Sequence, residues 1–140
     1  MRVRFAETDL MGIVHHSSYL LYFEEARVEY LARRGAVYLE WVARGMHFPV
    51  IDARCRYRTA ARFYDLLEIE TWIGEASRAT VRFDYLARRG DDVVAEGWTL
   101  LACIDDARRP RRIPPEVLDQ MLGPERQGVA PSIRPTTSSA

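Results

Sequence analysis

The amino-acid sequence predicts an α+β fold in which an antiparallel sheet is wrapped around one long helix. Two observations lead to this prediction. Residues 16–35 carry apolar side chains at spacings of three and four, which is the period of a helix with a buried side. Residues 51–104 alternate apolar and polar side chains in four successive runs, which is typical of antiparallel strands with one buried face. One such helix and one such sheet are expected to pack face to face.

The composition indicates one globular domain. The chain has 140 residues, of which 48% are apolar, and its formal net charge is zero. Domains that bind nucleic acid usually carry a basic excess, so no nucleic-acid partner is expected. No apolar run reaches the about 18 residues of a membrane span, and the first residues lack the apolar region of a signal peptide. We therefore expect a cytoplasmic protein without a membrane span.

The first element is predicted to be a short strand. Residues 2–6 alternate charged and apolar side chains, and this run brings the expected sheet to five strands. Residues 7–13 break the alternation, and Gly12 within them indicates a turn or a close approach of the backbone.

The long helix is expected to begin near His16 and to end near Gly35, a length of roughly 18 residues. Ser17 and Ser18 are start signals, because serine often caps a helix. Its apolar side is broad, so the helix is predicted to be largely buried. A second, less regular helix is expected over residues 36–45.

The remaining strands follow with short connections. The sequence Arg89-Gly90-Asp91-Asp92 is typical of a hairpin turn, and Gly97 inside the last strand indicates a bulge. Two cysteines at unrelated positions form neither a disulfide framework nor a zinc ligand set. The predicted strands cover residues 51–57, 67–73, 81–87 and 93–104.

Several prolines end the last strand. Residues 115–122 are predicted to form a short terminal helix with proline in its first turn. The stretch 123–140 is rich in Pro, Ser, Thr and Gly, which predicts a flexible tail after a single domain over residues 1–122.

The chemistry is expected between the first strand and the long helix. Here Asp9, Gly12 and two adjacent histidines directly precede the helix start. The first N–H groups of a helix lack internal partners and carry the positive end of its dipole, so an oxyanion is stabilised there. A carboxylate beside such a site can attack a thioester as a nucleophile or draw a proton from water as a general base. The sequence leaves both roles open for Asp9.

Each of these residues also has a purely structural interpretation. Asp9 is equally typical of a turn or a helix cap, and Gly12 of a simple turn. His16 is compatible with an ordinary polar residue at the helix start. The pair His15-His16 matches no zinc-binding spacing, so no metal site is expected.

The segment ETDLMGIVHHSSYLLYFEEARVEYL resembles the signature of the 4-hydroxybenzoyl-CoA thioesterase-like group of hot-dog proteins. It is especially similar to the Tol–Pal-associated (YbgC-type) acyl-CoA thioesterases. The resemblance continues in RYRTAARFYDLLEIET and covers about residues 2–122. The matching positions are Asp9, Gly12, Val14, His16, Tyr19, Phe23-Glu24 and Ala26-Arg27.

The resemblance implies a five-stranded hot-dog fold around a central helix and an acyl-CoA thioesterase activity. It implies a homodimer or homotetramer with sites at the subunit interface, and no metal or bound cofactor. Asp9 matches the catalytic aspartate. His16 matches the position whose backbone N–H polarises the thioester carbonyl, with its imidazole as a second aid. Gly12, Val14 and Tyr19 are expected to shape the substrate site.

Coenzyme A brings phosphates, which guanidinium groups bind well. All 20 basic residues are arginines, and Arg56, Arg58 and Arg62 are the predicted phosphate contacts, with the cluster at residues 108–112 as a further candidate. Any of these arginines is also compatible with a solvated surface position.

Three other functions compete with acyl-CoA hydrolysis, and the sequence bears on each of them differently. An acyl-carrier-protein thioesterase would use the same fold, with arginines facing an acidic carrier. A hot-dog dehydratase places its histidine and carboxylate on different elements, an arrangement that this sequence does not show. A non-catalytic protein that binds acyl thioesters would keep the fold, but it would have no need to retain Asp9.

Overall fold

The structure is a computed structural model that describes residues 1–126. The predicted tail therefore lies mostly outside the described residues, and its flexibility stays a prediction. Residues 123–126 lie against the end of the long helix, where the backbone N–H of Arg126 donates to the carbonyl of Arg33 at 2.8 Å. The elements are, in order, the 3₁₀ helix η1 (Phe5–Glu7), α1 (Ser18–Arg33), α2 (Tyr38–Ala43), β1 (Val50–Tyr57), β2 (Glu68–Ala76), β3 (Thr80–Arg89), β4 (Asp92–Ala102) and α3 (Pro115–Leu122).

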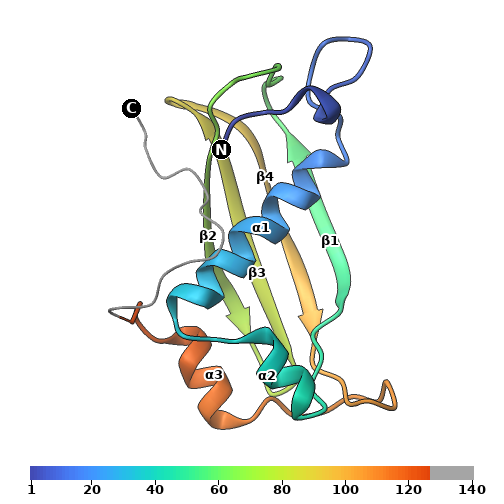
Figure 1. The fold of residues 1–140 in the computed structure, drawn as a ribbon, viewed down its shortest axis with the longest axis vertical. Coiled ribbons are helices and arrows are strands. Elements are labelled where there is room, and N and C mark those ends of the chain that lie inside the picture. Colours follow the sequence, from blue (N-terminus) through green and yellow to red (C-terminus); the bar gives the residue numbers. More distant parts are fainter. Residues whose placement is uncertain (127–140) are drawn as a thin grey trace.

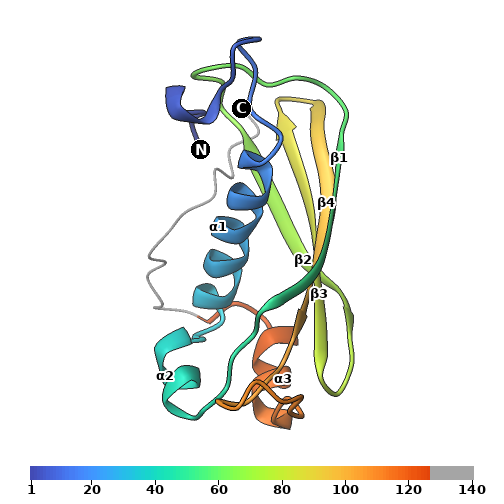
Figure 2. The ribbon, with the colours of Figure 1, turned by 90° about the vertical axis from the view of Figure 1, so that its right-hand side faces the viewer.

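The four strands form one antiparallel sheet in the order β1-β4-β3-β2. Helix α1 crosses one face of this sheet, starting beside β1 and ending beside β2 (Figure 1). None of the helices in residues 1–126 covers the opposite face (Figure 2). The core lies between α1 and the sheet, where the ring of Phe23 stacks on that of Tyr85 at 4.4 Å. The predicted α+β class is confirmed.

The prediction of five strands is wrong, because the N-terminal segment does not form a strand. Met1 and Val3 do hydrogen-bond with residues 64–67, but only Arg2 and Leu66 make a bridge. The pairing stops because residues 5–7 turn into η1.

The side chain of Glu7 stabilises that turn. Its Oε1 accepts a hydrogen bond from the backbone N–H of Arg4 at 2.7 Å. A carboxylate that reaches back to the N–H of the capping residue favours helical over extended backbone. The alternation of residues 2–6 did not reveal this contact.

Helix α1 is also shorter than predicted, with 16 residues. It starts at Ser18 because the preceding residues form a turn, in which the N–H of Ser18 donates to the carbonyl of His15 at 2.9 Å. Its burial is uneven. Phe23 and Ala26 are fully buried, whereas 60% of Leu21 is exposed, so the broad apolar side is only partly covered in one protomer.

The turns and short helices lie where the sequence predicted them, with one exception at Gly97. The two-residue turn between β3 and β4 is confirmed, with Gly90 at φ +60°. Helices α2 and α3 form where they were expected. Gly97 makes no bulge, because it pairs in register with Cys55 and Tyr85. A Cβ at Gly97 would lie 2.0 Å from the carbonyl oxygen of Arg54, so glycine is needed for this close strand contact.

The edge strand β1 differs from the inner strands. Buried and half-buried residues alternate along most of β3, as expected for a sheet with one covered face. All residues of β1 except the half-buried Cys55 are exposed, on both faces of the strand. Strand β1 is therefore an open edge of the sheet.

Candidate active site

A tight loop carries Asp9 to the start of α1. Thr8 and Val14 form an antiparallel bridge across the loop. Inside it, the N–H of Asp9 donates to the carbonyl of Ile13, and the N–H of Gly12 donates to the carbonyl of Asp9, both at 2.9 Å. Gly12 has φ +78°, a conformation that favours glycine. The loop thus has a defined shape set by its own backbone.

Asp9 is half-buried, and one of its two carboxylate oxygens accepts a hydrogen bond from the loop. Its Oδ1 accepts a hydrogen bond from the N–H of Met11 at 2.8 Å, which fixes the side chain over the loop. Its other oxygen, Oδ2, accepts no hydrogen bond from residues 1–126. That oxygen is therefore available to a substrate or a water molecule.

A buried carboxylate ties the loop to α1. Glu7 Oε1 accepts a hydrogen bond from the hydroxyl of Tyr22, on the second turn of α1, at 3.0 Å. Burial, and then Glu7, raise the pKa of Tyr22 well above its usual range, so the hydroxyl stays a donor. The backbone carbonyl of Glu7 accepts from the N–H of His15 at 2.8 Å and from the hydroxyl of Ser18 at 3.3 Å. The loop and the helix start are held as one unit.

Strand β1 contributes the other wall of the site. The hydroxyl of Tyr57 donates to the carbonyl oxygen of His16 at 3.1 Å, and its ring packs edge-on against Tyr19 at 5.5 Å. Burial, with the contact to Cys55, raises the pKa of Tyr57 to about 12. Tyr57 is thus a stable hydrogen-bond donor at neutral pH. The backbone N–H of His16 makes no hydrogen bond within residues 1–126.

These residues enclose a pocket of about 230 Å³. Five predicted site residues line it together: Asp9, Val14, His16, Tyr19 and Arg58. The sequence interpretation missed Tyr57, which also lines the pocket. Tyr57 lies about 40 residues beyond the segment 9–19 that supplies most of the pocket, and its position at the end of an alternating run was the only signal available in the sequence.

The other predicted site residues lie outside this pocket. Gly12 shapes the loop without lining the pocket. Arg62 makes a backbone bridge with Ile13. Arg56 lines a separate hollow of about 280 Å³, which also includes Trp72 and Trp98. The arginines of residues 108–112 follow β4, at the end of the sheet opposite the loop that precedes α1 (Figure 1).

The Arg58 side chain already has a partner within the chain. Its guanidinium forms an ion pair with Glu96 at 2.6 Å. The hydrogen bond from Arg58 lowers the pKa of the Glu96 carboxyl below its ordinary value, against a smaller opposing effect of burial. A phosphate at Arg58 would therefore have to share or displace a carboxylate.

The two histidines of the pair lie side by side before α1. The rings of His15 and His16 lie 4.2 Å apart, and Nδ1 of His15 lies 2.8 Å from the hydroxyl of Ser17. Over residues 1–126, no group of three or more His, Cys, Asp and Glu side chains is placed to hold a metal ion. The same residues include no helix that is long and apolar enough to cross a membrane.

Comparison with known proteins identifies the family. Residues 3–121 match the Thioesterase-like superfamily. The chain belongs to this family of hot-dog thioesterases. A curated relative is the acyl-CoA thioesterase YbgC of Haemophilus influenzae, 32% identical over 119 residues, which cover 84% of this chain and 88% of that protein. The chain is accordingly a thioester hydrolase of the YbgC type.

Solved structures of other proteins share the fold. A hypothetical protein from Thermus thermophilus is 40% identical with a TM-score of 0.82, over 86% of this chain and 93% of that chain. A gentisyl-coenzyme A thioesterase is 25% identical with a TM-score of 0.78, over 88% of this chain and 98% of that chain.

Proposed function

We propose that this protein hydrolyses an acyl-CoA thioester to the free acid and coenzyme A. The observation that carries this proposal is that the carboxylate of Asp9 and the start of α1 line one pocket. The YbgC relative, named an acyl-CoA thioesterase, supports the same reaction.

The roles follow from the free groups of the pocket. The N–H of His16 lies two residues before the first residue of α1 and lacks a partner among the described residues, so we assign it to the thioester oxygen. The free Oδ2 of Asp9 either attacks the carbonyl carbon, giving a mixed anhydride that water then hydrolyses, or takes a proton from the attacking water. In both routes the C–S bond breaks, the water oxygen enters the acid, and the thiolate is protonated to free coenzyme A.

We assign substrate contacts according to whether a residue lines the Asp9 pocket. Val14 and Tyr19 line the pocket together with Asp9, and Gly12 permits the conformation of the loop that carries Asp9. Arg58 is the arginine of the pocket wall, so it is our first candidate for a phosphate of coenzyme A. Arg56 and Arg62 stay weaker predictions, because neither lines the pocket.

We further propose a homodimer that pairs strand β1 of two protomers. An eight-residue edge strand exposed on both faces presents unpaired backbone groups, which natural proteins rarely leave open. A second copy paired antiparallel across a two-fold axis would cover them. A homotetramer built from two such dimers, and a cytoplasmic location, stay predictions.

The proposed reaction is tested by free thiol release from a panel of acyl-CoA esters, from acetyl to palmitoyl and including benzoyl and 4-hydroxybenzoyl. We expect turnover of at least one ester, with activity that follows the protein peak through gel filtration. The same acyl groups on an acyl carrier protein should react more slowly. A preference for the carrier would replace the CoA assignment. Binding of esters without turnover would leave a non-catalytic role.

A further inference from the structure

No helix of residues 1–126 covers the outer face of the sheet, which lies opposite α1 (Figure 2). This face carries a hollow of about 280 Å³. The neighbours of Asp84 along β3, Phe83 and Tyr85, are buried in the core, so the side chain of Asp84 faces away from α1. One row of paired residues crosses all four strands at the hollow: Arg54 of β1, Trp98 of β4, Asp84 of β3 and Trp72 of β2.

Two tryptophans flank Asp84 in this row and give the hollow aromatic walls. Trp72 is 44% exposed, and Trp98 is half-buried. They lie two strand spacings apart, about 10 Å between their Cα atoms. Aromatic rings stack with their centroids about 4.5–7 Å apart, so one flat ring fits between the two indoles.

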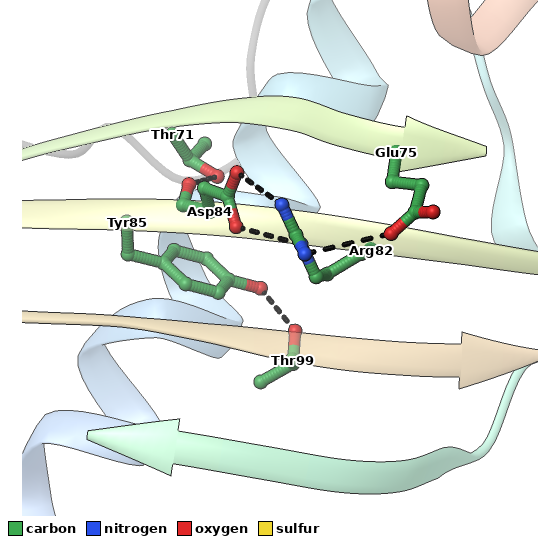
Figure 3. A network of polar contacts seen from close by, with 6 residues as sticks. All are labelled: Thr71, Glu75, Arg82, Asp84, Tyr85 and Thr99. Carbon is green, nitrogen blue, oxygen red and sulfur yellow. Dashed lines mark hydrogen bonds and ion pairs between the residues drawn. The ribbon is translucent and has the colours of Figure 1, made fainter.

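Both carboxylates that line the hollow already have arginine partners. Asp84 accepts hydrogen bonds from Nε of Arg82 at 3.0 Å and from its Nη2 at 3.3 Å, and Nη1 of Arg82 lies 3.5 Å from Glu75 (Figure 3). Glu96 forms its ion pair with Arg58. These two carboxylates are neutralised by their partners, so the hollow holds no unpaired negative charge that would attract a cationic ligand.

The groups left free in the hollow are hydrogen-bond donors. Arg54 and Arg56 are exposed, and neither guanidinium forms an ion pair or a hydrogen bond within residues 1–126. The indole N–H groups of Trp72 and Trp98 also lack an acceptor among these residues. Arg54 and Arg56 lie two positions apart on one strand, about 7 Å between their Cα atoms, so their long side chains can bind one phosphate together. The hollow thus joins an aromatic slot to two unpaired cations.

The sheet separates the hollow from the Asp9 pocket. Tyr57 of β1 faces α1, where its ring packs against Tyr19, whereas Arg54 and Arg56 of the same strand face outward. In the dimer proposed above, the edge of β1 is paired with its partner, which closes the route around that edge. A substrate whose thioester lies at Asp9 therefore leaves the hollow free for a second ligand.

We propose that this hollow binds a nucleoside phosphate other than the substrate, with its base between the two indoles and its phosphate on Arg54 and Arg56. Every base has a flat face that stacks on an aromatic side chain, and guanidinium groups match the geometry of phosphate. The volume lies just below the lower limit of ordinary ligand pockets, about 300 Å³, so a mononucleotide fits better than a dinucleotide. Binding at this hollow does not depend on the hydrolysis proposed for the Asp9 pocket.

Titration with AMP, followed by calorimetry and by tryptophan fluorescence, tests this proposal. We expect one AMP per protomer, with a Kd below about 1 mM. Adenosine and inorganic phosphate should each bind at least about tenfold more weakly, because each offers only one of the two contacts. Lack of saturation up to about 10 mM AMP would overturn the proposal.

Two variants locate the bound AMP. Trp72→Leu changes a side chain that is largely exposed, so the fold should persist while AMP binds about tenfold more weakly. Arg54→Gln should weaken AMP binding about tenfold and leave the binding of adenosine unchanged. Arg112→Gln, at an exposed arginine outside the hollow, is the matched control and should bind AMP as the wild type does. If Trp72→Leu and Arg54→Gln both keep the wild-type Kd, AMP does not occupy the hollow and the proposal is wrong.

Coenzyme A also carries a nucleotide, so kinetics must separate the two sources of this chemistry. If the hollow serves a second ligand, Arg54→Gln should keep the wild-type KM for an acyl-CoA and for the matching acyl-pantetheine, which lacks the nucleotide. A KM raised about tenfold for the acyl-CoA alone would assign the hollow to the nucleotide end of the substrate, and it would overturn the proposal of a second ligand. If the wild type hydrolyses neither ester, the proposed function fails, and the AMP titration still decides whether the hollow binds a nucleotide.

Discussion

The two ends of α1 differ in what they contain. At its N-terminal end, the pocket has a carboxylate, a free N–H group and a tyrosine donor, but only about 230 Å³ of space. At its C-terminal end, a cavity of about 330 Å³ has aromatic walls, with Arg27 and Glu24 as the only charged lining residues among residues 1–126. We propose that bond cleavage takes place at the first end, whereas the lining of the second is mainly apolar and aromatic. Changes at the first end should slow all substrates equally, whereas changes at the second should reorder them.

The largest effect on stability is expected at the catalytic end, from Glu7→Ala. This substitution leaves the buried hydroxyl of Tyr22 and the N–H of Arg4 without their acceptor. We expect a loss of about 3 kcal/mol in the free energy of unfolding, with slower hydrolysis of every ester. Urea denaturation measures the loss. Arg4→Ala is the matched control and should cost about 0.5 kcal/mol, because that side chain is 77% exposed. An equal loss in the free energy of unfolding for Glu7→Ala and Arg4→Ala would show that Glu7 does not organise the loop.

At the cavity end, Val28→Ala should change selectivity rather than rate. The smaller side chain widens the cavity, so kcat/KM for a bulky aromatic ester should rise about tenfold relative to that for a short aliphatic ester. Competition between the two esters in one reaction gives this ratio directly. A ratio equal to that of the wild type would show that Val28 does not affect substrate choice.

A smaller and uniform effect is expected from Tyr57→Phe. The substitution deletes the hydroxyl that donates to the carbonyl of His16. A lost hydrogen bond of about 1 kcal/mol corresponds to about a fivefold decrease in kcat/KM. The decrease should be the same for aromatic and aliphatic esters. Tyr64→Phe, at an exposed tyrosine outside the pocket, should have no effect.

The smallest effect concerns acid stability near the loop. Burial alone would raise the pKa of Asp65, but hydrogen bonds from the N–H of Arg62 and the guanidinium of Arg89 lower it below its ordinary value. A carboxyl with a lowered pKa stabilises the fold above its ordinary pKa, about 4, and this contribution is lost as pH falls through the folded value. The Tm advantage of wild type over Asp65→Asn should therefore shrink between pH 5 and pH 2.5. A constant advantage would contradict the assignment.

The same comparison explains what the sequence could predict. The Asp9 pocket is lined mostly by residues 9–19, whose order and spacing are visible in one short segment, so the sequence could point to most of its lining. Their catalytic role stays a prediction. The cavity combines parts of α1, α2, α3 and three strands, and no local pattern marks residues such as Phe48 or Met121 as neighbours. Its assembly depends on tertiary packing.

Element boundaries show the same limit. Alternation predicted the four sheet strands and the turn at Gly90, because both depend on neighbouring residues. It also predicted a strand over residues 2–6, where the Glu7 side chain instead stabilises η1. For Gly97, the sequence predicted a bulge, whereas the structure shows that glycine is needed because the carbonyl oxygen of Arg54 lies too close for a Cβ.

The most direct test compares kcat/KM of the wild type, Asp9→Asn and Asp91→Asn on the best acyl-CoA ester. Asp91 is an exposed turn residue and serves as the matched control. We predict that Asp9→Asn loses at least about a hundredfold, or about 2.7 kcal/mol of transition-state stabilisation, while Asp91→Asn equals the wild type. A fully active Asp9→Asn enzyme would contradict the assignment of Asp9 as the catalytic carboxylate.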